Sequence, residues 1–129
     1  MLDLTGLYAV PLALLMIGLW AHVSMKRSET GTSILDGGHM ELAERIRRHG
    51  NLIETAPMAL LLMAFSEAGG TAPVWSHAAG LCLLAGRILH PFGLHHDRPA
   101  SPLRIIAGLL TWISMLISMT NIVVNHWLG

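Results

Sequence analysis

The sequence predicts an all-α membrane domain, a bundle of four transmembrane helices. Of the 129 residues, 53% are hydrophobic and 12% are charged, a balance too apolar for a soluble domain of this size. Four windows are long and apolar enough to span a bilayer, at residues 4–24, 49–68, 73–90 and 103–128. We therefore assign residues 1–129 to a single transmembrane domain, with helices at about 4–24, 39–68, 73–90 and 103–128.

The positive charges between these windows set the expected orientation. All eight Lys and Arg residues lie in or beside the first and third connections: Lys26, Arg27, Arg45, Arg47, Arg48, Arg87, Arg98 and Arg104. By the positive-inside rule both connections are cytoplasmic, and both termini lie on the outer, periplasmic side. The cations are few and the net charge is zero, so the composition does not indicate nucleic-acid binding.

The first helix is expected to be a retained span rather than a signal peptide. It has no positive n-region and no small-x-small cleavage site. Pro11 lies in its first half, where membrane helices tolerate proline if neighbours satisfy the freed carbonyl. Lys26 and Arg27 follow the span, either as topology signals or with one of them reaching a neighbouring pocket.

The second helix contains the main candidate site. Arg47, Asn51 and Glu54 are spaced i, i+4 and i+7, so they share one stripe of the helix. A span of about 20 residues at the end of this helix places Asn51 and Glu54 within the membrane and Arg47 at its rim. Polar groups at that depth favour a functional site over a solvated helix end. The first turns project from the bilayer, and we expect their charges to form solvated faces: Glu41, Glu44, Arg45 and Arg48.

The third helix adds charge at the same depth. A short connection makes it an antiparallel neighbour of the second helix, which brings Arg87 and His90 level with Glu54. An ion pair between Glu54 and Arg87 is then available, and we favour a structural role for it. The connection that follows carries His95, His96 and other groups that can bind metals, but their spacing matches no established motif, so we expect no metal site.

The fourth helix carries a polar stripe and an arginine at its start. Its small, hydroxyl and amide residues are spaced 3, 4, 3 and 4, which is typical of a bundle or oligomer seam: Thr111, Ser114, Ser118, Asn121 and Asn125. The positive charge of Arg104 lies at the start of this helix, where the helix dipole is also positive, so the dipole does not stabilise it. Its position is best explained by an anion that it binds, whether a ligand, Glu54 or a lipid phosphate.

The polar groups expected at one depth suit a small zwitterionic ligand with several carboxylates and an amine. They are Arg47, Asn51, Glu54, Arg87, His90 and Arg104. If the ligand carried a thiol, a nearby arginine would favour the nucleophilic thiolate.

At these residues the chain resembles a known family. The motif RxxxNxxExxP (Arg47, Asn51, Glu54, Pro57), the AGRILH segment and the arginine opening the fourth span resemble the MAPEG family, the membrane-associated proteins in eicosanoid and glutathione metabolism. DGG followed by RRHGN, and GRILH-x-x-G-x-HH, are similar to its bacterial inner-membrane YecN-like branch.

The resemblance implies a homotrimer that binds glutathione between adjacent subunits near the cytoplasmic side. By motif match Arg47, Asn51 and Glu54 would hold the tripeptide, and Arg104 would activate its thiol. Arg27, or Lys26, would approach from the neighbouring subunit. The expected glutathione-binding set is completed by two residues of the third helix: Arg87 and His90.

The sequence departs from the eicosanoid-producing members of the family. Where those carry tyrosines, this chain has Thr55, His90 and Leu94, which argues against a leukotriene or prostaglandin synthase. Two hypotheses remain. One is a glutathione-dependent transferase or peroxidase acting on lipophilic electrophiles or hydroperoxides. The other is a non-catalytic membrane protein that binds a lipid head group or a partner in the same pocket.

Overall fold

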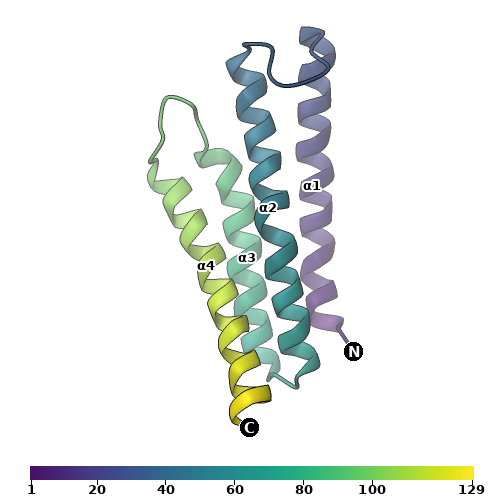
Figure 1. Cartoon of the computed structure of the whole chain (residues 1–129), viewed down its shortest axis with the longest axis vertical. Coiled ribbons are helices and arrows are strands. Elements are labelled where there is room, and N and C mark those ends of the chain that lie inside the picture. The colour runs from purple at the N-terminus through teal and green to yellow at the C-terminus, as the bar shows by residue number, and fades with distance from the viewer.

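The computed structural model describes every residue from Met1 to Gly129 and contains four long helices. Figure 1 shows them as an up-and-down bundle, with the α1–α2 and α3–α4 connections at one end and both termini at the other. Their bounds are α1 Asp3–Thr30, α2 Met40–Ala68, α3 Pro73–Gly93 and α4 Pro102–Val123, which continues as the short π-helix η1, Val124–Leu128. The predicted all-α bundle is confirmed, and the two cationic connections share one end, here called the connection end.

Two helices are longer than the spans predicted for them. α1 continues past residue 24 as far as Thr30, because the polar segment at its end is still compatible with a helix. It stops where Gly31 adopts a left-handed conformation with φ 66° and donates its N–H to the Arg27 carbonyl. α3 continues through Pro91 to Gly93, so the connection to α4 is shorter than the sequence suggested.

The four helices differ in how well their length and composition suit a membrane span. By length and composition, two of them are apolar enough to cross a bilayer: α1 and the continuous helix from Pro102 to Leu128. We expected α2 and α3 to span as well, but the charged residues of α2, and Arg87 with two histidines in α3, lower their hydropathy. Large apolar side chains are exposed on the outside of the bundle, among them Leu14, Phe65 and Leu116. Such a surface suits lipid rather than water.

The core lies where α1, α2 and α3 meet. Its buried residues are Tyr8, Leu12, Leu52, Ala56, Ala59, Met63, Ala79 and Leu83. The ring of Tyr8 packs on Gly80 so closely that any added Cβ there would overlap it. The phenol oxygen of Tyr8 lies 2.8 Å from Nδ1 of His77, a half-buried partner for the hydroxyl.

α3 and α4 approach each other closely along the predicted polar stripe. A Cβ added at Gly86 would lie 2.7 Å from the carbonyl oxygen of Ala107. Beside this contact Thr111 is buried, and so are Ser114 and Ser118 farther along the stripe. The seam therefore lies between α3 and α4 of this chain.

At the other end of the bundle, a carboxylate of α2 caps α1. Glu67 accepts hydrogen bonds from the backbone N–H groups of Leu4 and Thr5, both at 2.8 Å, and from the Thr5 hydroxyl at 2.6 Å. These backbone groups have no partner within α1, and a negative charge suits the helix N-terminus. The cap fixes the start of α1 against the end of α2.

Candidate functional site

The polar stripe on α2 is formed as predicted, but its ion pair is different. Both oxygens of Glu54 lie 3.1 Å from the two terminal nitrogens of Arg47, two helical turns away. The carboxylate of Glu54 raises the pKa of Arg47. The side chains are 54% and 56% exposed, so the pair lies on the outer face of the bundle. The expected pairing of Glu54 with Arg87 is wrong, because Arg87 points into the bundle.

Arg87 is 2% exposed and forms no ion pair. Its Nη1 donates to Oδ1 of Asn51 and, at 3.0 Å, to the hydroxyl of Thr55. Its Nε is buried without a hydrogen-bond partner. A buried cation with no carboxylate beside it is costly, and a bound anion would relieve that cost.

Arg87 borders a cavity between α2, α3 and α4 that opens to the surface beside Trp112, here called the inner cavity. Its volume is about 250 Å³. His90 lies one turn after Arg87, is 4% exposed and also lines this cavity. The full lining is Asn51, Thr55, Arg87, His90, Arg104, Gly108, Thr111, Trp112 and Met115. No carboxylate is among these residues.

A second cavity, here called the loop cavity, lies beneath the α3–α4 connection. Its volume is about 230 Å³. The lining is Ala43, Glu44, Arg47, Asn51, Leu94, His95, His96, Pro99 and Arg104. Asn51 and Arg104 border both cavities, so the two spaces adjoin.

Arg104 occupies the first turn of α4 and faces both cavities. Its Nη1 donates to the carbonyl of Pro99 at 3.1 Å, and the guanidinium has no carboxylate partner. A third space, an apolar groove of about 380 Å³, runs from Arg104 along α4 past Ile105, Leu109 and Trp112. Arg104 thus borders two polar cavities and one apolar groove.

The backbone around Arg104 is fixed by the end of α3. The hydroxyl of Ser101 donates to the Gly93 carbonyl and accepts from the Arg104 backbone N–H at 3.3 Å. A Cβ added at Gly93 would lie 2.5 Å from that same backbone nitrogen, so only glycine fits. The place of Arg104 is therefore set by packing between helices.

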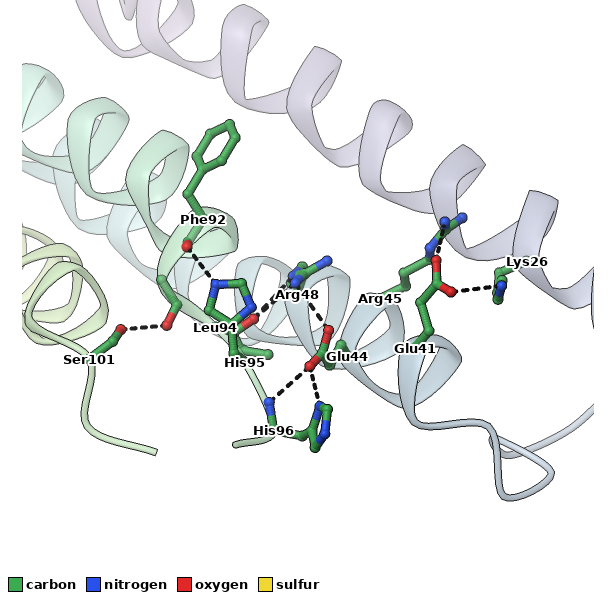
Figure 2. A network of polar contacts seen from close by, with 11 residues as sticks. Lys26, Glu41, Glu44, Arg45, Arg48, Phe92, Leu94, His95, His96 and Ser101 are labelled. Atoms are coloured by element: carbon green, nitrogen blue, oxygen red, sulfur yellow. Dashed lines mark hydrogen bonds and ion pairs between the residues drawn. The ribbon is translucent and has the colours of Figure 1, made fainter. Parts of the chain in front are cut away.

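The α3–α4 connection is held down by two residues of α2 that we expected to be solvated (Figure 2). Arg48 donates to the carbonyl of Leu94 through Nε at 3.3 Å and Nη2 at 3.0 Å. Glu44 accepts the backbone N–H of His96 at 2.9 Å, contacts Nδ1 of its ring and pairs with Arg48 at 3.3 Å. The hydrogen bonds from His96 lower the pKa of Glu44. Sequence spacing gave no signal for the contacts with Leu94 and His96, which lie 46 and 52 residues away from Arg48 and Glu44.

The cations near the end of α1 lie apart from the cavities. Arg27 donates to the carbonyls of Leu35 at 2.8 Å and Thr32 at 3.4 Å, within the α1–α2 connection. Lys26 lies 2.8 Å from Glu41, which raises the pKa of Lys26 and lowers that of Glu41. Arg27 is the one predicted site residue that the fold does not bring to the others.

Charge and shape together define what the site can bind. The inner cavity offers N–H donors and positive charge, while Glu44 and Glu54 supply acceptors at the loop cavity and on the outer face. An anionic group fits the inner cavity, and an ammonium group fits beside the carboxylates of Glu44 and Glu54. The site thus offers separate places for a negatively and a positively charged group.

Comparison with known proteins identifies relatives of the chain. A family model described as the MAPEG family matches residues 5–124. The inner membrane protein YecN of Escherichia coli strain K12 is 41% identical over 92 residues, which cover 71% of this chain and 70% of the relative. The YecN protein of E. coli O6:H1 matches with the same identity and coverage. No solved structure matches the chain.

Proposed function

This chain belongs to the MAPEG family of membrane proteins, and on that premise we propose that it is a glutathione-dependent transferase or peroxidase. Its acceptors would be lipophilic electrophiles or hydroperoxides that arrive through the bilayer. The observation that carries the proposal is the position of Arg104, which borders both polar cavities and the apolar groove. A polar co-substrate and an apolar acceptor could meet there.

The residues present fit glutathione. The inner cavity is lined by the Asn51 amide and by Arg104 and has no carboxylate, so an anionic group of the tripeptide would fit it. Arg47 and Asn51 would hold carboxylate or amide oxygens of the tripeptide, and Glu54 would accept its ammonium group. His90 lines the inner cavity together with Asn51.

Arg104 would act on the sulfur. Glutathione supplies the nucleophile of both reactions: its thiolate displaces a leaving group from carbon, or two thiols are oxidised to a disulfide as a hydroperoxide becomes an alcohol and water. The Arg104 guanidinium stabilises the thiolate and lowers the thiol pKa, and the released proton passes to water. Trp112 and Leu109 would hold the acceptor's apolar part.

We also propose that the protein is a homotrimer. Arg47 and Glu54 are more than half exposed on the outer face of α2, at a depth where lipid is a poor neighbour for charge. A second subunit against this face would shield them and bring its Arg27 toward the site.

The proposed location is a bacterial inner membrane, as the name of the Escherichia coli relative suggests. The connection end carries the Lys and Arg residues, which supports a cytoplasmic site and periplasmic termini.

Binding of glutathione to the purified protein in detergent tests the proposal. Calorimetry should detect binding by the wild type and by Arg98→Ala, a control at an exposed arginine outside the cavities. Arg47→Ala and Glu54→Ala should lose it while remaining folded. If the wild type does not bind millimolar glutathione, the assignment is wrong.

A non-catalytic role is the second candidate. The groove beside Arg104 favours it, because a lipid phosphate could lie at the guanidinium with an acyl chain along α4. Turnover of 1-chloro-2,4-dinitrobenzene or cumene hydroperoxide separates the two. An enzyme loses turnover in Arg104→Ala while keeping much of its glutathione binding, whereas a binding protein has no turnover to lose.

A further inference from the structure

The side-chain amide of Asn51 faces two cavities, and its oxygen already accepts a hydrogen bond. Arg87 Nη1 donates to Oδ1 of Asn51, and Asn51 lines both the loop cavity and the inner cavity. A guanidinium has donors only, so it must meet the oxygen of the amide and not its nitrogen. The two N–H groups of Asn51 Nδ2 have no acceptor within the chain.

The hydroxyl of Thr55 completes this arrangement. It accepts from Arg87 Nη1 at 3.0 Å and donates to the backbone carbonyl of Asn51 at 2.8 Å. Its proton is thus directed away from the guanidinium. Asn51 and Thr55 are one turn apart on α2 while Arg87 comes from α3, so packing of the two helices sets the geometry before any ligand binds.

We infer that Arg87 is a positioning residue, which orients the Asn51 amide so that Nδ2 presents its two donors to the cavities. Arg104 borders the same spaces, and no carboxylate lines the inner cavity. The lining then selects a ligand group that accepts hydrogen bonds, such as a carboxylate, over an ammonium. Only the identity of that ligand as glutathione rests on the proposed function.

Asn51→Asp tests the orientation without any ligand. The carboxylate has nearly the shape of the amide, and beside Arg87 it would form an ion pair that compensates the buried cation. The melting temperature should rise in this variant. The melting temperature should not rise when Asn51→Asp is introduced into the Arg87→Met variant, because the cation that the carboxylate would pair with is then absent. A lower melting temperature in the single variant, which retains Arg87, would overturn the inference even if Arg87→Met does not fold.

Glutathione affinity tests the function of the amide. Asn51→Asp replaces the donors by acceptors, so its Kd for glutathione should rise about ten-fold or more although the protein is more stable. Arg87→Met should also raise Kd, and Arg87→Lys, which keeps a donor for Oδ1, should recover part of the loss. Asn125→Asp is the matched control at the other end of the bundle and should leave Kd unchanged.

A double-mutant cycle distinguishes positioning from direct binding. If Arg87 acts through Asn51, the variant with both Asn51→Ala and Arg87→Met binds no more weakly than Asn51→Ala alone. If the two losses in glutathione affinity instead multiply in the double variant, Arg87 binds the ligand itself and the inference is overturned. If the wild type does not bind glutathione, the proposed function fails and the melting temperatures alone decide this inference.

Discussion

Glu44 of α2 accepts the backbone N–H of His96 at 2.9 Å and so joins the second helix to the connection between the third and fourth. The same carboxylate pairs with Arg48, which itself donates to the carbonyl of Leu94. These contacts hold the connection over the loop cavity, which Arg47 and Arg104 also line. The connection is therefore an ordered part of the site.

Replacing Glu44 should loosen this connection. Glu44→Gln keeps an acceptor for the His96 N–H but loses the charge, so we expect the loop to open more easily by about 1 kcal/mol. Hydrogen exchange at the His96 amide measures the effect and should become several-fold faster. Glu29→Gln, at an exposed glutamate away from the loop, is the control. Equal exchange in Glu44→Gln and wild type would contradict the role of the carboxylate.

The same contact should depend on pH. The pKa of Glu44 is lowered by the hydrogen bonds from His96, so the folded loop favours the carboxylate. A group whose pKa is lowered in the fold stabilises it above the unfolded pKa, and this contribution is lost as the pH falls through the folded value. Protease cleavage within residues 94–101 should therefore accelerate below about pH 4.5. Glu44→Gln should show no such acceleration.

Gly93→Ala should disturb the start of α4. The added Cβ would lie 2.5 Å from the Arg104 backbone nitrogen, and backbone on both sides prevents an easy adjustment. We expect a loss of about 1–3 kcal/mol in stability, typical of overpacking. Gly108→Ala is the matched control, because its added Cβ has no atom within 4 Å outside the adjoining helix backbone. Thermal unfolding in detergent compares both variants with the wild type. If Gly93→Ala melts at the same temperature as the wild type, the close approach is not required.

The cap on α1 should contribute measurably to stability. Glu67→Ala removes the acceptor of three hydrogen bonds from Leu4 and Thr5, and we expect a loss of about 1–2 kcal/mol, as for other N-terminal caps. Amide exchange at Leu4 and Thr5 should increase more than exchange in the core. Asp3→Asn, at an exposed position, is the comparison. Unchanged exchange at both amides would exclude a capping role.

Helical periodicity predicted much of this fold and site. The spacing of Arg47, Asn51 and Glu54 fixed their common stripe, and the short second connection placed Arg87 and His90 near it. Both arguments are local, because they need only the helix repeat and an antiparallel neighbour.

The pairings across helices could not be predicted in the same way. Whether Glu54 meets Arg47 or Arg87 depends on the rotation of α2 and α3 about their axes. Periodicity limits that rotation but does not determine it. Glu44 and Arg48 look like solvated residues because their partners, His96 and Leu94, lie far away in sequence.

Arg104→Ala should show how this arginine contributes to turnover. If the guanidinium lowers the thiol pKa of bound glutathione, its removal raises that pKa and reduces the thiolate fraction near neutral pH. We expect turnover of 1-chloro-2,4-dinitrobenzene to fall about 10- to 100-fold at pH 7, or about 1.4–2.7 kcal/mol in activation free energy. The deficit should shrink as the pH rises, because hydroxide then deprotonates the thiol without help. Ultraviolet absorbance of the bound thiolate should show the same shift. Arg104→Lys retains the cation and should lose less, whereas a deficit that is constant at all pH values would mean that Arg104 positions a substrate instead of activating the thiol.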